Sequence, residues 1–129
     1  MKIELREMHY KDSQLLFQWV NDRELIQYTN YFHPVSQIEH EEWFREVFRR
    51  EGQVLFGIED RDEQKLIGTC GLFGIDEISR KAELRIKIGD KKYWGKGAGT
   101  EAVNLLIEYA LNSLNLNRIW LKVIKDNTR

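Results

Sequence analysis

Residues 82–102 read AELRIKIGDKKYWGKGAGTEA, and this stretch decides the fold. From Ala82 to Ile88 apolar and charged side chains alternate, which is the period-two pattern of a strand. A loop with glycines at alternate positions follows from Tyr93 to Gly99. From about Ala98 to Leu114, apolar residues recur at the spacing of an amphipathic helix. The stretch therefore predicts a strand, a glycine-rich loop and a helix in direct succession.

The glycine-rich loop predicts a binding site for an anion. Glycine lets the backbone approach a ligand closely, and the free N–H groups of a helix's first turn point to the same place. The helix dipole adds partial positive charge, so the arrangement suits phosphate. The cations beside the loop are Lys91, Lys92 and Lys96. The spacing fits neither G-x-x-x-x-G-K-[ST] nor G-x-G-x-x-G, and a tight turn that only caps the helix is the alternative.

The remaining elements indicate a chain of mixed α and β structure. Further strands are expected at residues 1–6, Val54 to Ile58, Leu66 to Phe73 and Arg118 to Ile124. Further helices are expected after Asp12 or Ser13, around Leu25 and Ile26, and after Ser36, which has capping-box spacing to Glu39. Short turns between the middle strands predict antiparallel pairing, and the crossover through the last helix predicts a parallel final pair. The expected fold class is α+β, a mixed and mostly antiparallel sheet flanked by helices.

Composition restricts the class of protein further. The chain of 129 residues, 42% hydrophobic and 32% charged, is expected to form one globular domain, residues 1–129. A net charge of -1 argues against a nucleic-acid partner. The single cysteine, Cys70, is expected to be a buried structural thiol and fits a reducing, cytoplasmic setting. No apolar run approaches the ~20 residues of a membrane span, and no clustered ligands predict a metal site.

From Ala82 onward the sequence resembles the acetyl-CoA-binding core of the GNAT superfamily of N-acetyltransferases. The family's phosphate loop, Q/R-x-x-G-x-G/A, falls on Trp94 to Gly99, with Trp94 in place of the usual Gln or Arg. Thr100-Glu101-Ala102 and the stretch from Asn117 to Asn127 extend the resemblance. It is closest to the subgroup of ribosomal-protein N-terminal acetyltransferases.

This resemblance implies an enzyme that transfers the acetyl group of acetyl-CoA to a primary amine by direct attack. The acceptor would be an amine-bearing small molecule or a protein N-terminus. Backbone N–H groups on the strand before the loop would line the pantetheine arm. The residues implied to bind acetyl-CoA are Ile86, Lys87, Ile88, Trp94, Gly95, Lys96, Gly97, Ala98, Gly99, Thr100 and Asn127. A non-catalytic acyl-CoA-binding or regulatory module of the same fold is the alternative.

Glu83 is the candidate general base. An amine is protonated at neutral pH and must lose a proton before it attacks a thioester. Glu83 begins the cofactor strand within an Ala-Glu-Leu triplet that is similar to related enzymes. The alternative is that Glu83 only pairs with Arg85, two residues along on the same face of the strand.

The resemblance also predicts that the fold lacks its closing elements. In the family, an Asn like Asn127 precedes a helix with a tyrosine that serves as general acid, and then two more strands. This sequence ends at Arg129. The last strand, Ile119 to Ile124, is then an apolar edge, which is expected to pair with a second copy in a homo-oligomer.

Two groups of residues in the first half of the chain could contribute to an acceptor site. Trp43, Phe44 and Phe48 could line a pocket, although aromatic residues at helical spacing more often pack in the core. A loosely acidic region could attract a cationic amine or simply be a solvated helix face; it comprises Asp22, Glu24, Glu39, Glu41 and Glu42.

Overall fold

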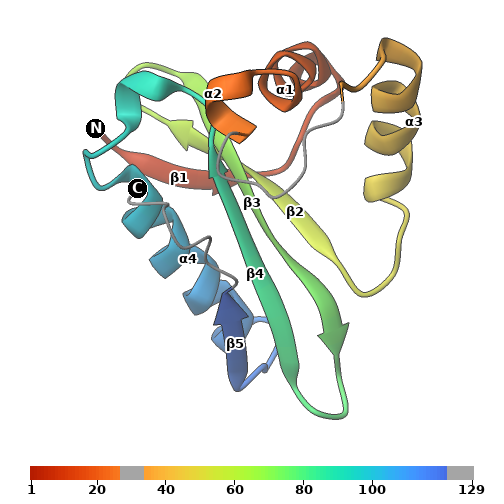
Figure 1. The fold of residues 1–129 in the computed structure, drawn as a ribbon. Helices are drawn as coiled ribbons and strands as arrows, with labels where there is room; N and C mark the ends of the chain where they lie inside the picture. The colour runs from red at the N-terminus through yellow and green to blue at the C-terminus, as the bar shows by residue number, and fades with distance from the viewer. Residues whose placement is uncertain (27–33, 122–129) are drawn as a thin grey trace.

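The computed structural model describes residues 1–26 and 34–121, and this part of the chain forms a five-stranded sheet (Figure 1). The strand order follows the sequence: β1 (Ile3–Arg6), β2 (Val54–Asp60), β3 (Lys65–Asp76), β4 (Lys81–Ile88) and β5 (Arg118–Leu121). The pairs from β1 to β4 are antiparallel, and β4 pairs with β5 in parallel. The predicted mixed, mostly antiparallel sheet is therefore confirmed, and residues 122–124 of the predicted last strand lie outside the described residues.

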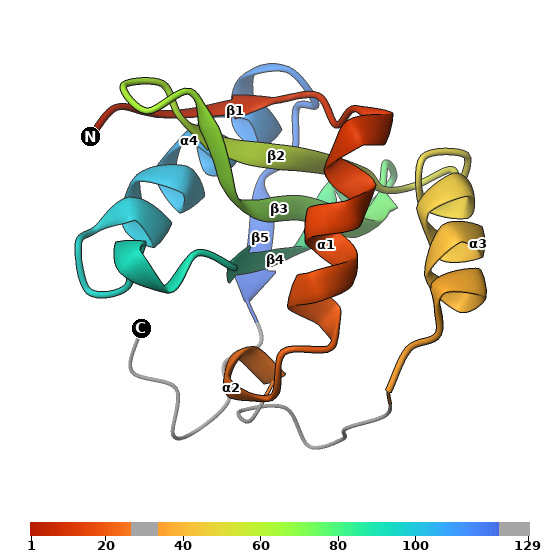
Figure 2. The same cartoon turned by 90° about the horizontal axis from the view of Figure 1, so that it is seen from above.

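Helices cover both faces of this sheet. The helices are α1 (Ser13–Val20), α2 (Arg23–Ile26), α3 (Gln37–Val47) and α4 (Ala98–Asn112), with short 3₁₀ turns η1 (Tyr10–Asp12) and η2 (Lys91–Tyr93). Figures 1 and 2 show α1 and α4 on opposite sides of the strands. α4 packs against β1, β3 and β4, whereas α1 packs against α2 and α3.

The main core lies between α4 and the sheet. On β4 the alternate residues Ala82 and Leu84 are buried, as the period-two pattern predicts. The helix presents a stripe of buried residues spaced four apart: Ala98, Ala102, Leu106 and Ala110. Because three of these are alanine, the helix can approach the strands closely. The Cys70 thiol, 1% exposed, belongs to this core, and burial raises its pKa to about 12, so it is an inert structural thiol.

The capping box that opens α3 is confirmed. Ser36 Oγ accepts a hydrogen bond from the Glu39 N–H at 3.1 Å, and Glu39 Oε1 accepts one from the Ser36 N–H at 3.2 Å. Phe44 is buried, but Trp43 and Phe48 are 40% and 46% exposed, so the prediction that both pack in the core was wrong. Phe48 follows the last residue of α3, and its ring lies edge-on against Phe44 instead of entering the core.

The entry to α1 uses a different contact from the one expected. Asp12 stands at the N-cap position, yet its side chain makes no capping hydrogen bond to α1. Its carboxylate instead accepts two hydrogen bonds from Arg6, at 2.9 and 3.1 Å, and one from the His9 N–H at 2.8 Å. The charge pair with β1 therefore outcompetes the helix cap.

None of the helices in the described part of the chain has the length and apolar character of a membrane span.

Gly89 sets the distance between α1 and the end of β4. A Cβ atom at Gly89 would lie 2.1 Å from Cδ2 of Trp19, a separation that a rigid ring cannot tolerate. We therefore expect Gly89→Ala to lower the free energy of unfolding by about 1–3 kcal/mol, the usual cost of overpacking, in urea denaturation. The control is Gly99→Ala, whose Cβ would lie at an ordinary 3.8 Å from Ile88. Equal stability of the two variants would contradict the tight α1–β4 contact.

Candidate active site

Among the described residues, β5 pairs with the first half of β4. The parallel register joins Lys81–Leu84 to Arg118–Leu121. Beyond Leu84, residues 85–88 of β4 have no strand on that side within the described ranges, as Figure 1 shows. Among residues 1–26 and 34–121, the C-terminal half of β4 therefore has an open edge on this side.

The pairing with β3 decides which peptide groups lie on that edge. The Gly89 N–H donates to the Ile67 carbonyl at 2.9 Å, so Gly89 faces β3. Because successive peptide groups alternate in direction, Lys87 also faces β3, whereas Ile86 and Ile88 face the open edge. The Ile88 carbonyl accepts a hydrogen bond from Nε1 of Trp94 at 2.9 Å. The edge is left with both polar groups of Ile86 and the N–H of Ile88.

The glycine-rich loop forms a cradle of N–H donors next to this edge. Gly95 and Gly97 have φ of 73° and 85°, in the left-handed region that glycine adopts without strain, and Gly97 is the N-cap of α4. Among the described residues, no carbonyl or side chain accepts a hydrogen bond from the N–H groups of residues 95–100. A Cβ atom at Gly95 or Gly97 would meet no atom within 4 Å. The loop is therefore open, rich in donors and located at the positive end of a helix, which fits a diphosphate.

The lysines beside the loop have different environments. Lys91 Nζ lies 2.9 Å from Asp22 Oδ2 and 2.8 Å from Glu24 Oε1, so this cation is already neutralised by the α1–α2 corner. Lys92 and Lys96 make no ion pair with any residue in the described ranges, and both are exposed. Of the cations predicted beside the cradle, these are the ones available to an anion.

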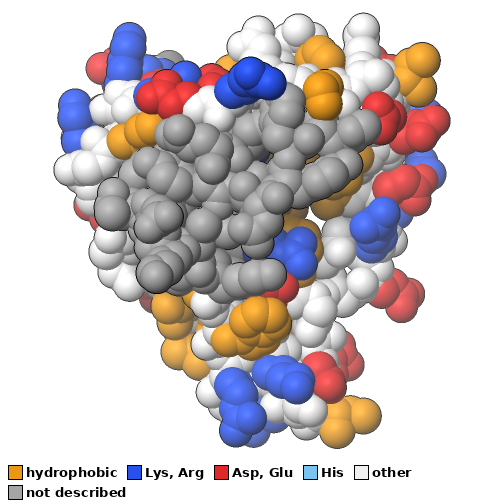
Figure 3. Space-filling view, in the orientation of Figure 1, with side chains coloured by type: hydrophobic (Ala, Val, Ile, Leu, Met, Phe, Trp, Pro, Cys, Tyr) orange, Lys and Arg blue, Asp and Glu red, His pale blue; other side chains and the backbone are white. Residues whose placement is uncertain are grey.

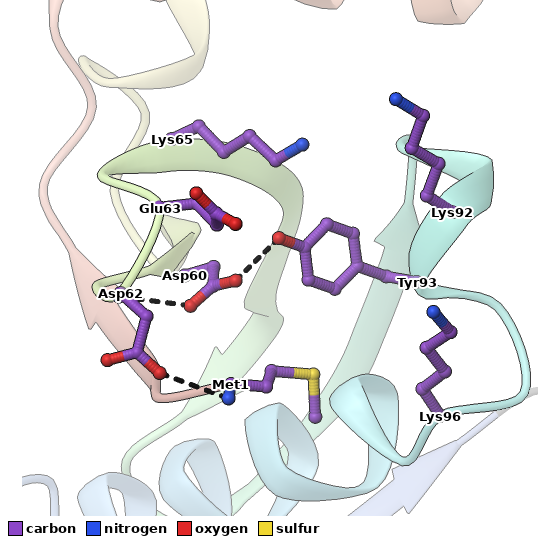
Figure 4. Close-up of a pocket in the computed structure, with 8 residues that line it drawn as sticks. All are labelled: Met1, Asp60, Asp62, Glu63, Lys65, Lys92, Tyr93 and Lys96. Carbon is purple, nitrogen blue, oxygen red and sulfur yellow. Dashed lines mark hydrogen bonds and ion pairs between the residues drawn. The ribbon is translucent and has the colours of Figure 1, made fainter.

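A pocket that the sequence analysis missed lies on the outer side of the loop (Figure 4). Its volume is about 560 Å³, and its lining residues are Met1, Asp60, Asp62, Glu63, Lys65, Lys92, Tyr93 and Lys96. The Tyr93 hydroxyl donates to Asp60 Oδ2 at 2.5 Å, which raises the pKa of Tyr93 to about 12. This bond ties η2 to the end of β2. Because its partners are 33 residues apart in sequence, no local motif could have indicated it.

Glu83 lies next to Leu84, the last residue of β4 that pairs with β5 among the described residues. Its side chain, 16% exposed, is directly opposite Phe73 on β3 and Trp120 on β5 in the sheet register. Glu83 Oε1 lies 3.0 Å from Nη2 of Arg85, so the pairing considered as the alternative role does exist. Lys87 is on the same face of β4; burial lowers the pKa of its amino group, and the nearby Asp22 opposes this effect. Asn127 lies outside the described residues.

A strand edge that is open among the described residues, next to a phosphate cradle at a helix N-terminus, fits a CoA-dependent acyltransferase. A family model described as "Acetyltransferase (GNAT) domain" matches residues 2–129. The chain belongs to the GNAT acetyltransferase family. The predicted family, fold class, type of enzyme and co-substrate, acetyl-CoA, are thereby confirmed at the level of the family.

Named relatives support this membership. The chain is 38% identical to an uncharacterized N-acetyltransferase, p20, of Bacillus licheniformis, over 98% of this chain and 72% of the relative. It is 32% identical to a putative ribosomal N-acetyltransferase, YdaF, of Bacillus subtilis, over 97% of this chain and 64% of the relative. A crystal structure of spermidine N-acetyltransferase from Vibrio cholerae, in complex with CoA and spermine, is similar with a TM-score of 0.80 and 27% identity. That match covers 92% of this chain and 69% of the other.

The ion pair between Lys91 and the α1–α2 corner gives a prediction for Asp22. The hydrogen bond from Lys91 holds the pKa of Asp22 below its ordinary value of 3.8. A lowered carboxyl pKa contributes stability above 3.8, and this contribution is lost as the pH falls through the pKa of the folded state. We expect Lys91→Gln to raise the pKa of Asp22 in an NMR titration. Lys92→Gln is the matched control and should leave it unchanged; the same Asp22 pKa in both variants would contradict the assignment.

Proposed function

We propose that this protein transfers the acetyl group of acetyl-CoA to a primary amine by direct attack of the amine on the thioester. The observation that carries the proposal is the combination of the open β4 edge with the donor-lined cradle at the same end of the sheet. The β4 edge is suited to an extended polar chain, the glycine-rich loop is suited to a diphosphate, and the two are contiguous. Residues 1–129 are proposed to belong to one acetyl-CoA-binding N-acetyltransferase domain, in a cytoplasmic setting.

The cradle and the open edge would hold acetyl-CoA. The diphosphate would accept hydrogen bonds from backbone N–H groups of the loop, with Lys92 and Lys96 adding charge. The residues assigned to it are Trp94, Gly95, Lys96, Gly97, Ala98, Gly99 and Thr100. The pantetheine arm would lie along Ile86 and Ile88. The backbone contact expected from Lys87 was wrong, because the peptide groups of Lys87 face β3. Asn127 stays a prediction from the family resemblance.

Glu83 is assigned as the general base of this reaction. It precedes Leu84, which is the last residue of β4 with a β5 partner among the described residues, so it lies next to the edge of residues 85–88. From Ile88 to Leu84 the strand spans about 13 Å at ~3.3 Å per residue, which gives an extended arm room to lie along the open edge. The carboxylate would take a proton from the acceptor ammonium. The free amine then forms the amide bond as the carbon–sulfur bond breaks and the CoA thiolate leaves.

Backbone N–H groups on the open edge would stabilise the oxyanion that develops during attack. The carbonyl of Ile88 already accepts a hydrogen bond from the indole N–H of Trp94. The N–H of Ile88 is therefore the backbone polar group of this residue that remains available on the edge. Donors that are fixed in place before the reaction cost no reorganisation when negative charge appears. Holding both reactants in one orientation supplies much of the remaining rate.

The acceptor is proposed to be a primary amine on a small molecule or a protein N-terminus. The relatives divide between these classes, since one is named a spermidine acetyltransferase and another a putative ribosomal acetyltransferase. The α1–α2 corner contributes acidic residues, although Asp22 and Glu24 both contact Lys91. Thiol release from acetyl-CoA with a panel of polyamines, amino sugars and peptide N-termini would identify the class. No release with any amine would reject the proposed function.

The outer edge of β5 is proposed to pair with a second copy of the chain. Trp120 and Leu121 are both exposed, and no other strand of the described residues covers that edge. Pairing through β5 would extend the sheet across a homodimer. A monomer by light scattering at high concentration would reject this arrangement.

Gly97 gives a direct test of the cradle. Alanine at this position would be strained at a φ of 85°, by about 1–2 kcal/mol, and would place a methyl group in the open space of the loop. We expect Gly97→Ala to weaken CoA binding at least tenfold by calorimetry. Gly74→Ala is the control, because Gly74 also has a positive φ, 59°, with open space around it, but it lies on β3 outside the loop. Unchanged affinity of the Gly97 variant would sink the loop assignment.

Glu83→Gln tests the general base. The amide keeps the shape of the side chain but cannot take the proton, so kcat should fall by about 10²–10⁴, with the KM for acetyl-CoA little changed. The dependence of kcat on pH should also flatten on the acid side. A full rate with an unaltered pH profile would assign Glu83 only to its pair with Arg85.

A further inference from the structure

Three neighbouring strands place an acidic and two aromatic side chains in one row across the sheet. Glu83 on β4 is directly opposite Phe73 on β3 and Trp120 on β5. Directly opposite residues share a face of a sheet, and strands lie about 4.8 Å apart. This row, Phe73–Glu83–Trp120, lies on the face opposite α4, because the alternate residues Ala82 and Leu84 are buried under that helix.

Arg85 already shows what kind of group the row accepts. Its guanidinium carbon lies 4.4 Å from the centre of the Phe73 ring, and its Nη2 lies 3.0 Å from Glu83 Oε1. A cation is thus held by an aromatic face and a carboxylate together. The Arg85 side chain is 59% exposed, so it is free to move into solvent. Trp120, on the other side of Glu83, is 49% exposed and has no aromatic or cation–π contact within the described residues.

We propose that Phe73, Glu83 and Trp120 form the binding site for the alkylammonium group of the acceptor, and that Arg85 occupies this site until the acceptor displaces it. The inference rests on the proposed function and specifies its substrate class: a primary amine on an unhindered alkyl chain, recognised as a cation. Figure 3 shows hydrophobic, basic and acidic side chains next to one another on the surface over the lower half of β4 and β5. This agrees with a binding site that is accessible to solvent.

The physical basis is the pairing of one charge with one π surface. The face of an aromatic ring attracts a cation, and tryptophan does so most strongly. Glu83 is partly buried, which strengthens its attraction for a cation compared with a carboxylate in water. An ammonium ion held there lies against the base that must deprotonate it, so recognition and activation use the same carboxylate. A neutral molecule of equal shape gains neither contact.

The test uses n-butylammonium as the probe and 1-butanol as its neutral isostere, with binding followed by NMR. Arg85→Gln removes the competing cation and should bind the probe about three- to tenfold more tightly. Trp120→Leu and Phe73→Leu should each weaken binding about two- to fivefold, the effect of one exposed cation–π contact. Arg61→Gln is the matched control, since Arg61 is an exposed arginine that pairs with Glu4 and Glu59 away from the row. It should change nothing.

Separate readouts distinguish this site from the acetyl-CoA site. All these variants should bind CoA like the wild type, which also shows that they are folded. If Phe73→Leu is unstable, Trp120→Leu still tests the site, because Trp120 is exposed and its substitution leaves the core intact. Unchanged or weaker probe binding in Arg85→Gln, unchanged binding in Trp120→Leu, or equal binding of 1-butanol would overturn the proposal. Failure of the wild type to bind CoA would reject the proposed function instead, whatever the probe does.

Discussion

The unpaired edge of β4 is the constraint on which the site depends. A backbone N–H or carbonyl that lacks a partner is costly when buried, so an open strand edge must be covered by water, by another segment or by a ligand. In the part of the chain that the structure describes, β5 pairs with β4 as far as Leu84, and the edge beyond it carries polar groups of Ile86 and Ile88. An extended molecule with amide groups, such as the proposed pantetheine arm, would satisfy that edge as a strand does.

The cradle is held in register with this edge by contacts from three directions. The indole of Trp94 donates to Ile88 on β4, Tyr93 donates to Asp60 on β2, and Lys91 contacts Asp22 at the α1–α2 corner. Exposed ion pairs alone are worth little, typically under ~1 kcal/mol. The indole and phenol hydrogen bonds join partly buried groups, and we assign most of the positioning to them. These contacts therefore fix the position of the loop relative to the sheet.

Local patterns carried much of the fold but little of this anchoring. Alternation in residues 82–88 and the Ser36–Glu39 box each depend on neighbours in sequence, and both predictions hold. The loop glycines predicted a cradle for the same reason. Contacts between distant residues left no such trace: the side chain of Asp12 binds Arg6 rather than capping α1, and Lys91 is neutralised by the α1–α2 corner. Phe48 was placed in the core because helical spacing ignores where the helix ends.

The strand β4 can contribute to the proposed sites for acetyl-CoA and for the amine as well as to the core, because its peptide groups and its side chains point in different directions. In β4 the peptide groups lie in the plane of the sheet, so the edge is available to acetyl-CoA. Ala82 and Leu84 point into the core beneath α4. Glu83 and Arg85 point to the opposite face, beside Phe73 and Trp120. A substitution that shifted the register of β4 by one residue would reverse both faces at once, so the core that buries Leu84 also fixes the face on which Glu83 and the proposed acceptor site lie.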